Sequence, residues 1–319
     1  MSATIEELPT TPAPSRRSFV LRPSVREALW GFVFIGPWLI GLVLFIAGPM
    51  IASLVMSLTD FNLVRPETTK FVGLDNYVRM ANDPTISQSL IATLKFALIA
   101  IPVTMLASLG FALLLNHPKL PAKGPLRALV YLPVMIPLVA STLVWIGFLN
   151  TETGWLNQIL GSLGLPQPDW INSETWIYPT LSIIGLWAIG NFMIINIAGL
   201  QSVPTELYEA ARIDGAGAWK SFRNITIPLM SPVLLYNLVI VLIGTFQYFT
   251  QAFVLTNGRG DPNNATLFIN LVLFREGFVF NHMGYAAAIA WLLFVIVLVL
   301  TLLLFGFARR RVYYAGGDR

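Results

Sequence analysis

The sequence contains no cysteine among its 319 residues and only two histidines. The absence of cysteine excludes disulfide bonds, zinc–thiolate sites and cysteine nucleophiles. The two histidines, His117 and His282, both fall outside the long apolar runs, so a histidine metal cluster is not expected either. We therefore expect neither a metal ion nor a cofactor.

Charge is scarce as well. Charged residues make up 11% of the chain and hydrophobic residues 55%, whereas a soluble domain carries roughly 25% charged residues. A membrane-crossing helix needs about 20 apolar residues, and six runs are long enough. They do not alternate between apolar and polar residues, as transmembrane barrel strands do. The sequence predicts an all-α polytopic membrane protein with spans at 30–57, 90–115, 126–149, 177–200, 232–256 and 285–307.

Several of these runs contain proline, which would break a helix in water. Inside a bundle, neighbouring helices can satisfy the backbone groups that proline frees. A further apolar stretch at 266–274 is short and is followed by Arg275 and Glu276. Runs of this length more often re-enter or lie at the interface than cross. A seventh span would also place the arginine-rich C-terminus outside, so we reject it.

The basic residues predict the orientation. With the N-terminus inside, fourteen lie on the inner side and five in the outer loops, namely Arg65, Lys70, Arg79, Arg259 and Arg275. This bias follows the positive-inside rule and places both termini in the cytoplasm. Lys95 alone falls within a span, near its outer end. We expect residues 1–28 to form a disordered basic tail, 29–310 the membrane domain and 311–319 a short cytoplasmic tail.

The outer loop at 150–176 has no basic residue. Its apolar residues at helical spacing predict a short amphipathic helix: Trp155, Ile159, Leu160 and Leu163. This stripe would either lie in the membrane interface or pack on the outer rim of the bundle.

The cytoplasmic loop at 202–228 is far less apolar than the spans. Pro204 suits a first helical position, and Asp214-Gly215 is a stop signal in which Gly215 can take the left-handed conformation. We expect one short helix before this stop and a second from about 217 to 225, after which Pro228 leads into the fifth span. Small alanines beside Trp219 and Phe222 fit two roles: a surface that docks on another protein, or a hairpin that packs under its own bundle.

The same loop resembles the EAA loop of the permease subunits of ATP-binding-cassette (ABC) importers. The matching residues are Glu209-Ala210-Ala211, Gly215, Ile225 and Pro228, with Ile227 where leucine is usual. Asp214-Gly215-Ala216 is the form most typical of carbohydrate permeases. Further similar segments are Gly36-Pro37-Trp38, Gly48-Pro49, and the stretches at 71–77 and 284–288, so the resemblance covers about 28–310. It is nearest to the first maltose or glycerol-phosphate permease subunit.

This resemblance implies a type I ABC-importer fold in a bacterial inner membrane. It implies two ABC ATPase subunits, a second homologous permease that we expect to be a different chain, an extracytoplasmic binding protein and a sugar substrate. The loop would act as the coupling helix that docks on the ATPase, through Glu209, Ala210, Ala211, Asp214, Gly215, Ala216, Phe222, Ile225 and Pro228. The chain has no phosphate-binding Gly-Lys-Ser/Thr loop and should not hydrolyse ATP itself.

Polar residues inside spans are candidates for contact with the sugar. They are Asn191, Asn196, Tyr236, Asn237, Gln247, Tyr248 and Gln251. Each could instead form hydrogen bonds between helices. An ion-coupled secondary transporter is the alternative function, but we find neither internal repeats nor mid-membrane ionisable residues. An intramembrane enzyme lacks its catalytic residues here, and we expect no nucleic-acid partner.

Overall fold

The computed structural model describes residues 25–309, so most of the predicted N-terminal tail and all of the tail at 311–319 lie outside the described residues. The chain divides into two compact units, 1–52 and 53–319. Within the described residues it is almost entirely helical, and the only β-structure consists of two isolated bridges, Thr59 with Phe71 and Asn62 with His282.

The described residues of the first unit, from Val25 onward, form one long helical run. Helix α1 (Val25–Leu42) passes through a π-helical turn (Val43–Ala47) into α2 (Gly48–Ser57), which continues into the second unit. The part from Gly31 to Ser57 is long and apolar enough to cross a membrane, as predicted for the first span. The widened turn lies just before Pro49, which has no N–H to donate to the helical ladder.

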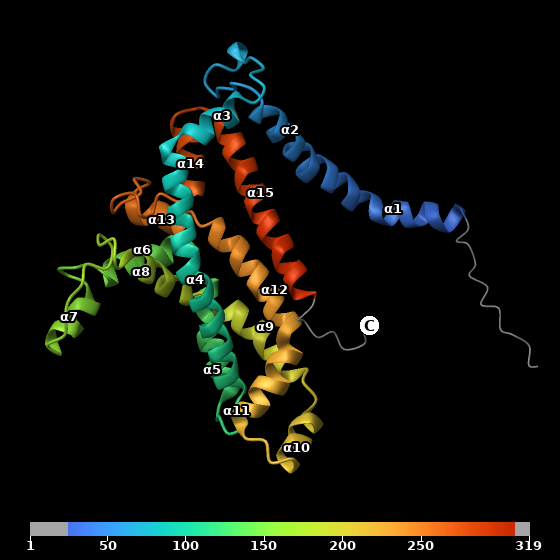
Figure 1. Cartoon of the computed structure of the whole chain (residues 1–319), viewed down its shortest axis with the longest axis vertical. Helices are drawn as coiled ribbons and strands as arrows, with labels where there is room; N and C mark the ends of the chain where they lie inside the picture. Colours follow the sequence, from blue (N-terminus) through green and yellow to red (C-terminus); the bar gives the residue numbers. More distant parts are fainter. Residues whose placement is uncertain (1–24, 310–319) are drawn as a thin grey trace, which may run out of the picture. The chain divides into compact units, whose positions relative to one another are not determined.

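The second unit is organised around α4 (Pro84–Asn116), a helix of 33 residues. Helices α8 (Ile177–Leu186), α9 (Gly190–Gln201) and α12 (Ile227–Phe246) pack against it. The last helix, α15 (Met283–Ala308), packs against α12 and α3 (Asp75–Asn82). Figure 1 shows α12 lying between α4 and α15.

Two of the six predicted spans are not single helices. The span at 126–149 consists of α5 (Lys123–Tyr131), a 3₁₀ turn (Leu132–Met135) and α6 (Leu138–Phe148), with a bend of 99° before α6. Pro133 and Pro137 account for this bend, because neither can donate a backbone hydrogen bond. The span at 177–200 bends by 59° between α8 and α9. In the described residues, four helices can cross a membrane, or up to six if each bent pair is one span.

The fifth span begins earlier than predicted. Helix α11 (Ala218–Ser221) continues through a π-helical turn (Phe222–Thr226) into α12, so the second loop helix is not separate from the span. Pro228 lies just after this π-helical turn, as Pro49 lies just after the π-helical turn at Val43–Ala47. Pro228 does not end the helix. After a break at 247–249, α13 (Thr250–Thr256) completes the helical stretch Ala218–Thr256.

The remaining elements are short. The stretch at 266–274 forms α14 (Ile269–Phe274), which a π-helical turn (Arg275–Val279) extends. It packs against α4 and α15 and is not among the helices long enough to cross, as expected. The loop at 150–176 forms α7 (Trp155–Ser162), the loop at 202–228 forms α10 (Thr205–Ile213), and a 3₁₀ turn (Pro66–Thr68) lies in the loop after α2.

Candidate functional site: the loop at 202–228 and a pocket at a helix break

Helix α10 of the loop at 202–228 ends in a complete Schellman motif. Gly215 has a φ of 75°, in the left-handed region, which confirms the predicted stop. Its N–H donates to the carbonyl of Arg212 at 3.0 Å, and the N–H of Ala216 donates to the carbonyl of Ala211 at 2.8 Å. These two bonds satisfy carbonyls that the end of a helix leaves free. Pro204 lies just before the first helical residue rather than within the helix.

One side of this loop packs on the bundle. The hydroxyls of Tyr208 and Thr226 lie 2.9 Å apart and tie α10 to the π-helical turn. Tyr208 and Ile225 also pack against the buried cluster at the ends of α4, α9 and α12. Among the residues implied by the resemblance, those partly buried are Ala211, Ala216, Phe222, Ile225 and Pro228.

The other side presents exposed groups. The remaining residues implied by the resemblance are all exposed: Glu209, Ala210, Asp214 and Gly215. Two bulky apolar side chains lie among them without burial, Ile213 at 88% exposed and Trp219 at 72%. Ile213 was not singled out in the sequence, although an isoleucine directly before a helix stop was the available signal. The loop thus both packs under its own bundle and offers an apolar surface.

Hydrogen bonds join α5 to the C-terminal ends of α4 and α9 beside this loop. Arg127, in the middle of α5, donates to the carbonyl of Leu115 at 3.0 Å and to Oδ1 of Asn116 at 3.4 Å. Gln201, the last residue of α9, donates to the same Oδ1 at 3.3 Å. A cleft of about 770 Å³ separates the end of α4 from α10, lined in part by His117, Tyr208, Glu209, Arg212 and Phe222.

Two of the seven substrate candidates form a buried link between helices instead. Asn196 and Asn237 are completely buried. Asn237 Nδ2 donates to Asn196 Oδ1 at 2.9 Å, and Asn196 Nδ2 donates to Ser108 Oγ at 3.1 Å, joining α12, α9 and α4. These contacts favour the packing interpretation for both asparagines.

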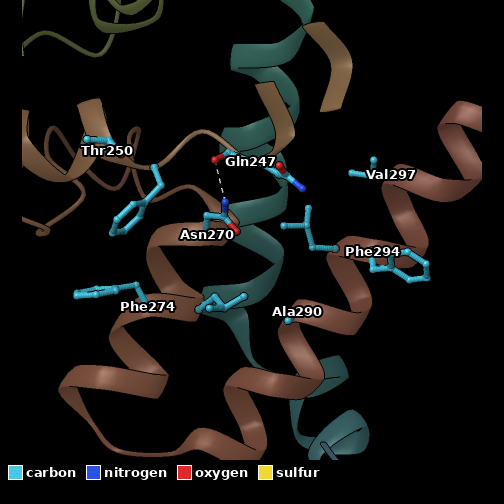
Figure 2. Close-up of a pocket in the computed structure, with 10 residues that line it drawn as sticks. Gln247, Thr250, Asn270, Phe274, Ala290, Phe294 and Val297 are labelled. Atoms are coloured by element: carbon cyan, nitrogen blue, oxygen red, sulfur yellow. Dashed lines mark hydrogen bonds between the residues drawn. The ribbon is translucent and has the colours of Figure 1, made fainter. Parts of the chain in front are cut away.

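Gln247 instead lines a pocket. It lies at the break between α12 and α13, where a cavity of about 590 Å³ opens towards α14 and α15. The side-chain Nδ2 of Asn270 in α14 donates to the backbone carbonyl of Gln247 at 2.8 Å, a bond that Figure 2 marks with a dashed line. Phe249, Phe274 and Phe294 supply aromatic walls, and the pocket lining includes no charged residue. Its chemistry suits a neutral ligand that has both apolar faces and hydroxyl groups.

The other four candidates are not among the residues that line this pocket. Tyr248 packs its ring 4.7 Å from that of Phe96, and its hydroxyl is buried with no hydrogen-bond partner in the described residues. Tyr236 and Asn191 are exposed and Gln251 is partly buried. Sequence reasoning missed Asn270, because it lies in the short stretch at 266–274 that was not treated as a span.

A polar cluster joins the end of α3 to the starts of α4 and α15. Tyr285 Oη donates to Asp83 Oδ2 at 2.9 Å, and the Arg79 guanidinium lies 3.8 Å from the centre of the Tyr285 ring. Burial would raise the pKa of Asp83, but hydrogen bonds from Thr85 and Tyr285 outweigh it and lower the pKa. Gly284 approaches the first outer loop so closely that a Cβ would lie 2.0 Å from the Thr59 carbonyl oxygen.

In the loop at 150–176, burial and hydrogen bonds also have opposite effects on the pKa of a carboxylate, that of Asp169. Burial would raise the pKa of Asp169, but hydrogen bonds from the backbone N–H of Asn172 and the hydroxyl of Thr151 lower it below its ordinary value.

Comparisons with known proteins agree with this arrangement. Residues 100–313 match the model of the family described as binding-protein-dependent transport system inner membrane component. A probable ABC transporter permease of Bacillus subtilis, YesP, is 36% identical over 91% of this chain and 93% of its own length. The lactose transport permease LacF of Rhizobium radiobacter is 33% identical over 88% and 94%. The trehalose/maltose transport permease MalF of Thermococcus litoralis is 34% identical over 87% and 92%.

Solved structures share the fold. A bacterial ABC transporter involved in the import of the acidic polysaccharide alginate superposes with a TM-score of 0.78, at 23% identity, over 90% of this chain and 97% of that chain. This likeness confirms the predicted type I importer fold. The family match covers the loop at 202–228, the two bent helix pairs and the pocket at the break in the fifth span. The relatives align over nearly their whole length. The chain therefore belongs to the family of inner-membrane components of binding-protein-dependent transport systems.

Proposed function

We propose that this chain is one of two permease subunits of a bacterial ABC importer for a sugar, with both of its termini in the cytoplasm. A second, homologous permease would complete the pathway, two ABC ATPase subunits would bind on the cytoplasmic side, and an extracytoplasmic binding protein would deliver the sugar. ATP hydrolysis belongs to the ATPase subunits. Two relatives are named as transport permeases for lactose and for trehalose and maltose, which supports a sugar as the substrate. Membership of the family argues against the alternative of an ion-coupled secondary transporter.

The main support for this proposal is the way in which the loop at 202–228 is attached to the bundle and exposes apolar side chains. Tyr208 ties α10 to the bundle, the Schellman motif at Gly215 fixes where that helix ends, and Ile213 and Trp219 remain exposed. A rigidly mounted helix with bulky apolar side chains on its free face has the properties of an element that seats in a groove on a partner. Because α11 continues into α12, a movement of the loop would pass directly into the fifth span.

The absence of cysteine allows a direct test of docking. A single cysteine in place of Ile213 should form a cross-link to a cysteine in the groove of the ATPase subunit when the complex is assembled. A cysteine in place of Thr153, in the outer loop, is the matched control and should form none. Labelling of the Ile213 position by an impermeant thiol reagent applied outside intact cells would contradict the proposal.

We further propose that the pocket at the helix break contacts the sugar. Amides bind hydroxyl groups and aromatic rings pack on sugar faces, and the pocket combines Gln247 and Asn270 with Phe249, Phe274 and Phe294. Gln247→Ala should raise the substrate concentration needed for half-maximal uptake without lowering the amount of protein in the membrane. Gln251→Ala, four residues further along the chain and outside the pocket lining, is the control. Equal uptake curves for the Gln247 variant and the wild type would refute the assignment.

A further inference from the structure

The outer loop at 150–176 carries an apolar face that nothing in the described part of the chain covers. Trp155, Ile159 and Leu163 follow one another at intervals of four residues along α7 and its C-terminal cap, so they share one side of the helix. Their exposed fractions are 71%, 53% and 66%. The sequence left open whether this stripe packs on the rim of the bundle, and these exposures argue that it does not.

The loop holds this face in a fixed direction. Asn157, on the opposite side of α7, is 2% exposed. Its Nδ2 donates to the carbonyls of Thr151 and Pro168, both at 3.1 Å, and its Oδ1 accepts from Trp170 Nε1 at 2.8 Å. The partners of Asn157 lie both before and after α7 in the chain. These hydrogen bonds therefore prevent α7 from rotating about its axis and burying its apolar side chains against its own loop.

The loop is also fastened to the bundle. Thr180 in α8 donates its hydroxyl to the carbonyl of Trp170 at 2.9 Å, so the segment that holds Asn157 is tied to a helix of the membrane domain. At the other end, α7 begins seven residues after Phe148, the last residue of α6. Figure 1 shows α7 beyond α6 and α8, on the side away from α12 and α15. The apolar face is therefore held close to where the chain leaves the membrane.

We propose that α7 lies in the lipid–water interface, with Trp155, Ile159 and Leu163 inserted at the boundary of the acyl chains. Tryptophan is enriched at that depth, because its ring is apolar and its N–H can still reach polar groups. Helix α7 contains no charged residue, so it offers no charge by which a soluble protein could be steered to it. The acidic side chains of the loop, Glu152, Asp169 and Glu174, all lie outside the helix.

The composition of α7 also indicates whether its binding to lipid depends on the charge of the lipid head groups. Interfacial helices usually combine buried apolar area with basic residues that attract anionic lipids. Since α7 has no lysine or arginine, its insertion must rest on apolar contact alone. The same depth is therefore expected in neutral phosphatidylcholine membranes and in membranes that contain anionic lipid, at low and at high salt.

The absence of cysteine makes the test direct. Single cysteines at positions 159 and 163 of the full chain, assembled with its partner subunits in lipid nanodiscs, are labelled with a nitroxide. Collision of each label with oxygen, which concentrates in the acyl chains, is compared with collision with a water-soluble nickel chelate. Thr153 and Gln158, both exposed and polar, provide matched control positions.

We expect labels at positions 159 and 163 to collide more with oxygen than with the chelate, and the label at position 153 to show the reverse. The result should be unchanged when neutral lipid replaces anionic lipid. A greater collision rate with the chelate at 159 and 163 would mean that the face is in water. Low collision with both reagents would mean that a protein covers it. Either outcome overturns the proposal, and neither depends on transport or on the identity of the sugar.

Discussion

The buried link between Asn237, Asn196 and Ser108 predicts an ordering of two alanine variants. Asn196 is the middle member, so Asn196→Ala removes both hydrogen bonds, at 2.9 and 3.1 Å. It also leaves the Asn237 amide with only a 3.5 Å contact to the carbonyl of Phe192. Asn237→Ala removes one of the two strong bonds. It also removes Oδ1 of Asn237, which is already buried without a partner in the described residues.

The magnitudes follow from these contacts. Hydrogen bonds between membrane helices contribute about 0.6 kcal/mol on average and about 1.7 kcal/mol at most, and a buried polar group that loses its partner costs about 1–3 kcal/mol. We therefore expect Asn196→Ala to lower the free energy of unfolding by about 2–3 kcal/mol. Asn237→Ala should lower it by about 1 kcal/mol, because it leaves fewer unsatisfied groups behind. Asn191→Ala, on the exposed side of the same helix α9, should change it little.

The assay is reversible unfolding of the purified variants in mixed micelles, together with uptake normalised to the amount of protein in the membrane. Because both asparagines are completely buried, normalised uptake should stay near that of the wild type. Two results would refute the reasoning. One is a larger loss of stability for Asn237→Ala than for Asn196→Ala. The other is a complete loss of uptake in a variant of unchanged stability, which would place that asparagine in the substrate pathway.

Three further predictions concern contacts outside this link. Gly284→Ala should sharply reduce the amount of folded protein, because its Cβ would lie 2.0 Å from the Thr59 carbonyl oxygen; normal membrane levels would contradict that close approach. Arg127→Ala frees the Leu115 carbonyl at the end of α4 and should lower the unfolding free energy by about 1–3 kcal/mol, measured in mixed micelles, where no change would contradict the brace. Asp169 has a lowered pKa, so its carboxylate contributes stability that is present above its ordinary pKa of 3.8 and is lost as the pH falls below it. The difference in thermal unfolding midpoint between the wild type and Asp169→Asn should shrink on acidification, and a constant difference would contradict the assignment.

The loop at 202–228 shows which structural features can be predicted from local sequence and which cannot. The stop at Asp214-Gly215 was predictable, because a left-handed C-cap depends on a single residue without a Cβ and on the helix before it. The fusion of α11 with α12 was not, since prolines at 228 and 232 normally end a helix. A widened turn at Phe222–Thr226 lets the helix continue past Pro228.

The substrate candidates show where local reasoning ends. From the sequence alone, an asparagine in a span that faces another helix cannot be distinguished from one that faces a cavity. Asn237 donates to Asn196 between two helices, whereas Asn270 donates to the backbone carbonyl of Gln247 and both of these residues line a pocket. Asn196 and Asn237 are far apart in the chain, and so are Gln247 and Asn270, so only the packing of the helices could assign them.

The sequence by itself determined the membrane class, the rough positions of the spans and the helix stop in the cytoplasmic loop, because these follow from the transfer of apolar residues out of water and from backbone preferences at single positions. The tertiary structure alone decided that two spans bend, which polar side chains are sealed between helices and which line a pocket. Those outcomes depend on which surfaces of distant helices meet. That is fixed by the packing of the whole bundle, where each buried amide must find a partner on another helix.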